Sequence, residues 1–94
     1  MFDAKILDTG EILFVGRLDA SQVDVAEKIL EEVTTSRTIN LKELEYISSA
    51  GLGILLAHQK RLKEAGHAMR LVNLNKHVKD IFILTGFDHI FEIE

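Results

Sequence analysis

Ser48-Ser49-Ala50-Gly51-Leu52-Gly53 follows an extended apolar segment that ends at Tyr46-Ile47, and it opens an amphipathic helix predicted over Leu52 to Ala65. Two adjacent hydroxyls therefore lie at the start of a helix. The first backbone N–H groups of a helix have no intrahelical partners, and the helix dipole adds partial positive charge there. Anions bind well at such an end. A serine in this position can be a helix cap, a nucleophile or a phosphorylation target.

Strand and helix patterns alternate on both sides of this stretch. Apolar runs bounded by turn residues predict strands over 4–7, 11–15, 37–41 and 68–73, with 42–45 as a turn or a single helical turn. Apolar residues at three- and four-residue steps predict helices over 23–33, 52–65 and 76–84, and 87–93 is a short strand or helix. The order β-β-α-β-α-β-α-(β) indicates an α/β fold, with helices packed on a mixed central sheet of about four to five strands.

A second turn belongs with the serine stretch. Gly16-Arg17-Leu18-Asp19 closes the second predicted strand, as Ser48-Ser49 closes the third. Sites in such sheets lie beyond the carboxyl ends of the strands, so the two turns are expected to be neighbours in space. Asp19 is either a plain cap of the following helix or a residue of the site, and both roles can hold together.

Composition limits the classes of function. The 94 residues predict one domain, 1–94, and the net charge of −4 argues against direct nucleic-acid binding. No apolar run reaches the ~18 residues that span a membrane, and no signal peptide is evident. The absence of cysteine excludes disulfides and fits a cytoplasmic location. A monomer is expected, because no coiled-coil seam is present.

Catalytic and metal-binding patterns are missing. No Gly-x-Ser-x-Gly nucleophile elbow surrounds Ser49, and no Gly-Lys-Ser/Thr follows the glycines as it would in a phosphate-binding loop. The histidines, His58, His67, His77 and His89, form no i, i+4 pair. We therefore expect a protein that is not an enzyme and that holds no metal or stably bound cofactor.

Four ordered motifs resemble the STAS family, and within it the bacterial anti-sigma factor antagonists. Gly16-Arg17-Leu18-Asp19 is similar to the family's glycine-x-leucine-aspartate, and Ile39-Asn40-Leu41 to its apolar-aspartate/asparagine-leucine strand. Tyr46 to Gly53 resembles the central aspartate-serine-serine/threonine-glycine-leucine-glycine signature. Leu84-Thr85-Gly86-Phe87 resembles the leucine-threonine/serine-glycine-leucine motif. Together these motifs span almost the whole chain.

Alignment on Gly51-Leu52-Gly53 carries the family's phosphorylated serine onto Ser49. The usual preceding aspartate falls on Ser48, which supplies no charge, and the following serine or threonine falls on Ala50. The resemblance implies a phosphosite pocket or partner-binding surface made of Asp19, Asn40, Ser48, Ala50, Gly51, Leu52 and Gly53. The N–H groups of Gly51, Leu52 and Gly53 are the expected phosphate donors. Tight helix–sheet packing is the structural alternative for the two glycines, and a structural hydrogen-bonding role is the alternative for Asn40.

The resemblance implies a switch controlled by phosphorylation. The unmodified domain would bind an anti-sigma factor that is also a serine kinase of the GHKL type, and so release a sigma factor. The kinase would then phosphorylate Ser49 with ATP and Mg²⁺, and a PP2C-like phosphatase would restore the active form. The alternative is a non-switching STAS interaction or scaffold module, which senses a small ligand or works with a transporter; Ser48 in place of aspartate favours it.

Overall fold

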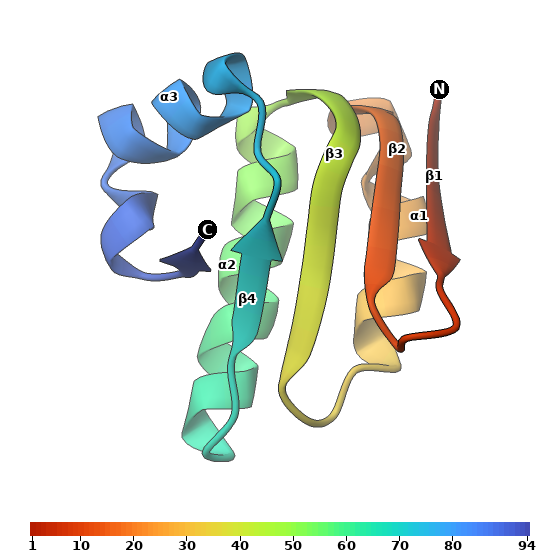
Figure 1. The fold of residues 1–94 in the computed structure, drawn as a ribbon, viewed down its shortest axis with the longest axis vertical. Coiled ribbons are helices and arrows are strands. Elements are labelled where there is room, and N and C mark those ends of the chain that lie inside the picture. The colour runs from red at the N-terminus through yellow and green to blue at the C-terminus, as the bar shows by residue number, and fades with distance from the viewer.

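The computed structural model describes residues 1–94 and contains one mixed five-stranded sheet (Figure 1). The strands stand in the order β1-β2-β3-β4-β5; β1 runs antiparallel to β2, and the remaining pairs are parallel. The elements are β1 (Phe2–Ile6), β2 (Ile12–Leu18), η1 (Ala20–Gln22), α1 (Val23–Glu31), β3 (Arg37–Ile47), α2 (Ser49–Glu64), β4 (Met69–Val72), α3 (Lys76–Thr85), η2 (Phe87–His89) and β5 (Glu92–Ile93). The predicted α/β class, the strand count and the order of elements are confirmed.

Helices cover one face of the sheet. In Figure 1, α1 and α2 lie behind the strands, and α3 lies beyond the β4 side. The core between these layers is made of alternate strand residues and the inner faces of the helices, including Phe14, Leu18, Leu55, Leu71 and Phe82, all fully buried. Period-two burial in the strands and period-3.6 burial in the helices follow from the direction of successive Cβ atoms. No helix of the structure combines the length and the apolar character needed to cross a membrane.

Strand β3 is longer than predicted. The turn expected over Lys42–Glu45 is wrong, because these residues continue one strand from Arg37 to Ile47. Leu41 and Leu44 are both buried, although three positions apart, and the pairing of β2 with β3 shifts register between Leu13 and Val15. An irregularity in the ladder absorbs the extra residue, and the charged side chains that suggested a turn point to solvent.

Strand β2 also extends beyond its predicted end, through Gly16 to Leu18. Gly16 adopts φ of 95°, and a Cβ at this position would collide with the main-chain carbonyl of Met1. The N–H of Arg17 donates to that carbonyl over 2.8 Å. Glycine at position 16 therefore allows the start of β1 to pair closely with β2. Strand β2 continues to Leu18, at the end of the sheet where β3 also ends.

The last third of the chain agrees closely with the sequence patterns. The Asn75 side chain accepts from the N–H of Val78 over 2.8 Å and caps α3, and Gly86, with φ of 78°, ends the helix. The segment expected to be strand or helix contains both, η2 and the two-residue β5. Helix α2 begins at Ser49 rather than Leu52, and this earlier start places both serines at its end.

Candidate functional site

The two predicted turns are neighbours in the structure. Leu18 pairs with Ile47 at the ends of β2 and β3, and the N–H of Ser48 donates to the Leu18 carbonyl over 2.9 Å. Asp19 therefore follows β2 directly beside the start of α2. The expectation that the carboxyl ends of these strands meet at one edge is confirmed.

Ser48 and Ser49 have different environments. Ser48 is half-buried, and its Oγ accepts from the N–H of Gly51 over 3.2 Å as the N-cap of α2. Its carbonyl oxygen accepts from the N–H of Leu52 over 2.9 Å. Ser49 is the first residue of the helix and is exposed, and its hydroxyl makes no hydrogen bond within the chain. Of the two hydroxyls, that of Ser49 is the one free to react.

The first turn of α2 leaves two N–H donors unused. The N–H of Ser48 donates to the Leu18 carbonyl, and the N–H of Gly51 donates to Ser48 Oγ. The N–H of Leu52 donates to the Ser48 carbonyl. The N–H of Gly53 lies beyond the first four positions and belongs to the regular helical ladder. The expected donor set of Gly51, Leu52 and Gly53 is therefore wrong. Ser49 and Ala50 carry the free N–H groups at this end.

Gly51 and Leu52 are parts of the packing between α2 and the sheet. A Cβ on Gly51 would lie 2.9 Å from side-chain carbons of Ile47 and Leu18 and 3.1 Å from the Leu18 carbonyl oxygen. Leu52 is 5% exposed and belongs to the core. Only a glycine lets the first turn of the helix approach the strand ends so closely. Gly51 and Leu52 therefore support the site from its buried side.

Gly53 and Ala50 belong to the surface around Ser49. Gly53 is exposed, and a Cβ at its position would meet no atom within 4 Å. Ser49 and Gly53 are four residues apart and thus lie on the same side of the helix. Ala50, next to Ser49, is half-buried. Two residues beside the free hydroxyl, Ala50 and Gly53, therefore carry a methyl group and no side chain, respectively.

Asp19 supplies negative charge beside this surface. Its Oδ1 accepts from the Ser21 hydroxyl over 2.6 Å and from the Ser21 N–H over 3.1 Å, which makes it the N-cap of η1. The Ser21 hydroxyl bond is the largest cause that lowers the pKa of the Asp19 carboxyl, with help from the backbone bond and from the positive charge of Arg17. Asp19 is therefore ionised near neutral pH and acts as a cap as well as a charge.

The structure does not bring Asn40 to this site. Asn40 lies seven residues before Ile47, about 20 Å along an extended strand. Its Oδ1 accepts from the Lys42 N–H over 3.0 Å and from Asn73 Nδ2 over 3.2 Å, and its Nδ2 donates to Glu11 Oε1 over 3.2 Å. Asn40 joins three segments of the chain, which agrees with the structural hydrogen-bonding role that was its alternative, and it lies away from the expected phosphosite pocket.

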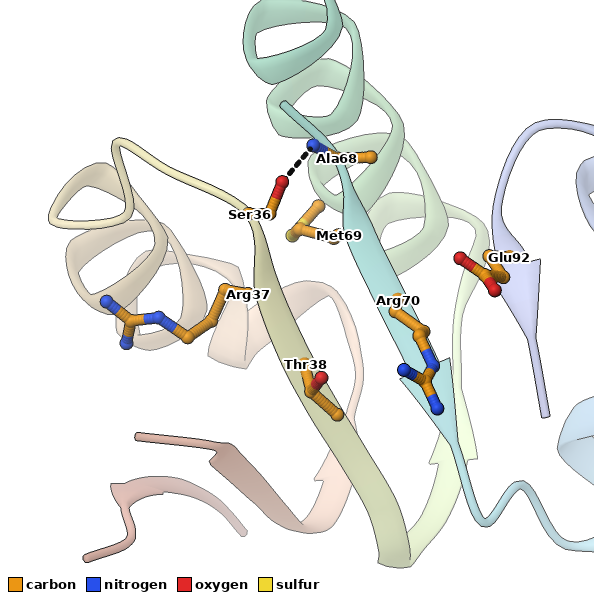
Figure 2. A pocket seen from close by; sticks show the side chains of 7 residues that line it. All are labelled: Ser36, Arg37, Thr38, Ala68, Met69, Arg70 and Glu92. Atoms are coloured by element: carbon orange, nitrogen blue, oxygen red, sulfur yellow. Dashed lines mark hydrogen bonds between the residues drawn. The ribbon is translucent and has the colours of Figure 1, made fainter. Parts of the chain in front are cut away.

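The cavities of the molecule lie at the other end of β3. One, of about 290 Å³, is lined by residues of the starts of β3 and β4 and by Glu92 of β5. Figure 2 shows its two arginines, Arg37 and Arg70, pointing in different directions from neighbouring strands. The second cavity shares Ser36, Arg37 and Thr38 with the first. Neither includes a residue of the Ser49 surface.

Two buried polar residues of α2 were not singled out as anchors by sequence reasoning. Gln59 accepts from the Met69 N–H over 2.7 Å and donates to the Ile90 carbonyl over 3.1 Å, so it joins α2 to β4 and to the C-terminal segment. His58, 6% exposed, contacts Glu27 of α1. Their position in the sequence could have identified them. Residues 55, 58, 59 and 62 share the inner face of the helix at helical spacing, and polar side chains buried there need hydrogen-bond partners.

Comparison with known proteins agrees with this architecture. A family model described as "Mlab, STAS domain" matches residues 7–92. BtrV of Bordetella bronchiseptica, which bears the name of an anti-sigma factor antagonist, is 35% identical over 74 residues; the match covers 79% of this chain and only 58% of BtrV. The anti-sigma-B factor antagonist of Bacillus subtilis is 30% identical over 86 residues, covering 88% of this chain and 79% of that protein.

Solved structures show the same fold. SpoIIAA, an anti-sigma factor antagonist, superposes in its unphosphorylated form with a TM-score of 0.75 at 20% identity, covering 100% of this chain and 88% of that chain. The phosphorylated form of SpoIIAA, a Bacillus cell fate determinant, gives a TM-score of 0.70 at 17% identity, with 100% and 91% coverage. Family match, relatives and fold agree, and this chain belongs to the STAS domain family.

Proposed function

We propose that this protein is an anti-sigma factor antagonist whose binding is switched by phosphorylation of Ser49. The observation that carries the proposal is the contrast between the two serines: Ser48 Oγ is bound as the helix cap, whereas the Ser49 hydroxyl is exposed and unbonded at the first helical position. The names of the relatives, which are anti-sigma factor antagonists, support the general function.

The proposed partner is an anti-sigma factor that is also a serine kinase of the GHKL type. In its unmodified form the surface of Ser49, Ala50 and Gly53 would bind this kinase and release the sigma factor. The kinase would transfer phosphate from ATP with Mg²⁺, and a PP2C-like phosphatase would remove it. On this proposal the chain itself works by binding and not by catalysis, in line with the regulatory names of its relatives.

Phosphorylation would change the charge of this surface without requiring a change of fold. A phosphate adds about −1.5 to −2 charge and three acceptor oxygens. The helix dipole stabilises it by roughly 0.3–1 kcal/mol, and the free N–H groups of Ser49 and Ala50 can donate to it. The ionised Asp19 opposes it. A compact charge in the middle of a contact area costs desolvation, and a loss of 2–4 kcal/mol weakens binding about 30- to 1000-fold.

One experiment separates the switch from a permanent binding module. Unmodified protein, protein with phosphoserine installed at position 49 during translation, and Ser49→Ala are each immobilised and exposed to extract of the native cell. We expect the unmodified and Ser49→Ala forms to retain the same ATP-binding kinase and the phosphorylated form to lose it, by about 30-fold or more. Equal retention by all three would contradict the switch.

The second candidate function is a non-switching STAS interaction module. Ser48 favours it, because this residue carries no charge where the antagonists commonly have an aspartate and its hydroxyl is already engaged with Gly51. Such a module would retain its partner whatever the state of Ser49, and the retained protein would not need to be a kinase.

A further inference from the structure

The contact between α1 and α2 contains a buried imidazole that the Ser49 site does not use. His58 is 6% exposed, and its Nε2 lies 2.9 Å from Glu27 Oε2 on α1. Its Nδ1 lies 2.9 Å from Nη2 and 3.3 Å from Nε of Arg61, nearly one turn further along α2. Nη2 of Arg61 also donates to the Leu30 carbonyl of α1 over 3.1 Å. Four polar groups thus form one chain across the two helices.

The partners of the imidazole fix its protonation. A guanidinium has N–H donors only and stays charged, so Arg61 must donate to Nδ1. Nδ1 is then an acceptor without a proton, and the single ring proton is on Nε2, where it is donated to the Glu27 carboxylate. The arrangement requires a neutral His58 in the Nε2–H form.

We infer that Glu27, His58 and Arg61 form a proton-sensitive latch between α1 and α2. A second proton on Nδ1 turns the acceptor of Arg61 into a donor and sets two cations against each other. Arg61 must then leave, and its bond to the Leu30 carbonyl is lost with it. Glu27 keeps its contact with the imidazolium. Acid therefore replaces two hydrogen-bonded contacts between the helices by a single ion pair.

The groups that act on the imidazole are few. Glu27 from α1 and Arg61 from α2 are the charged side chains that contact it, and the sheet beneath contributes apolar core residues. His58 lies nine residues beyond Ser49, about 13 Å along the helix. The inference does not depend on phosphorylation of Ser49.

Nuclear magnetic resonance on the full chain tests the latch directly. At pH 8, long-range proton–nitrogen correlations should show the Nε2–H form of His58. As the pH falls to 5, the Arg61 Nε–H signal should change from restrained to mobile with the same midpoint as the His58 ring. An Nδ1–H form at pH 8, or an Arg61 signal that does not follow the His58 titration, would overturn the inference.

Variants assign the proton to His58. In His58→Gln the mobility of Arg61 should no longer depend on pH, whereas His77→Gln, which removes an exposed histidine of α3, should behave as the unaltered chain. Glu27→Gln removes the charge that holds the imidazolium, and Arg61 should then be released at lower pH. A His58→Gln protein whose Arg61 still titrates like the unaltered chain would show that another group binds the proton.

Discussion

Two glycines of one helix illustrate how differently a single residue type can serve a site. Gly51 is needed for packing, because a Cβ there would lie within 3 Å of Ile47 and Leu18 side chains. Gly53 faces open space and adopts no conformation reserved for glycine. A glycine inside a helix costs about 0.5–1 kcal/mol relative to alanine. The fold therefore does not require a glycine at position 53, and the proposed contact surface around Ser49 would account for it.

Replacing Gly53 by alanine should stabilise the protein and weaken its function. We expect Gly53→Ala to raise the free energy of unfolding by about 0.5–1 kcal/mol in urea titrations, because the helix gains propensity without a clash. Phosphorylation of Ser49 in the cell should fall, since a methyl group now stands in the contact area. Gly51→Ala is the matched control and should lower the stability. A Gly53→Ala protein that is phosphorylated normally would remove Gly53 from the contact surface.

The Asp19 carboxylate leads to a prediction about how the stability of the fold depends on pH. Because the Ser21 hydrogen bond lowers its pKa below the ordinary 3.8, the folded state binds this proton more weakly than the unfolded state does. The bond therefore stabilises the fold above about pH 4, and this contribution is lost as the pH falls through the lower folded value. Asp19→Asn should flatten the acid side of the stability curve in urea titrations from pH 6 to 2. An unchanged slope below pH 4 would contradict this assignment.

At the scale of elements, β3 is both the centre of the sheet and the element that the sequence described least well. Its charged middle suggested a turn, yet β2 and β4 pair with it on either side and the backbone continues through an irregularity. The Asn40 side chain satisfies the displaced Lys42 N–H and joins the neighbouring segments. Local sequence patterns could not predict this continuous strand. The hydrogen-bond partners that hold it are distant in sequence, or they come into place only because the register of the β2–β3 pairing shifts.

Asn40→Ala tests this structural role. The substitution leaves the Lys42 N–H without its acceptor and removes the links to Glu11 and Asn73, so stability should fall by about 1–3 kcal/mol in urea titrations. Phosphorylation of Ser49 at a temperature where the variant is folded should remain unchanged. If phosphorylation were lost while stability was kept, Asn40 would belong to the functional surface after all.

For the whole molecule, the alternation of strand-like and helix-like hydrophobic patterns predicted the α/β fold class and the order of the elements. It also predicted that the Leu18–Asp19 and Ser48–Ser49 turns meet, because this follows from how the chain connects parallel strands. The start of α2 was not predicted correctly: the helix begins three residues earlier, and the cap residue Ser48 binds two of the three N–H donors that were assigned to phosphate. The latch at His58 also lay outside prediction, since it joins side chains 31 residues apart. Motif order predicted that the two turns meet, whereas hydrogen bonds and packing in the folded chain distinguish the roles of Ser48, Gly51 and Asn40.

The most direct measurement of the central claim is phosphopeptide mass spectrometry of the chain isolated from its native cell, with and without phosphatase treatment, in three forms: unaltered, Ser49→Ala and Ser48→Ala. We predict a phosphate on Ser49 in the unaltered and Ser48→Ala proteins, removed by phosphatase and absent from Ser49→Ala. A protein abundant under several growth conditions but never phosphorylated, or one phosphorylated at another residue when Ser49 is intact, would contradict the account.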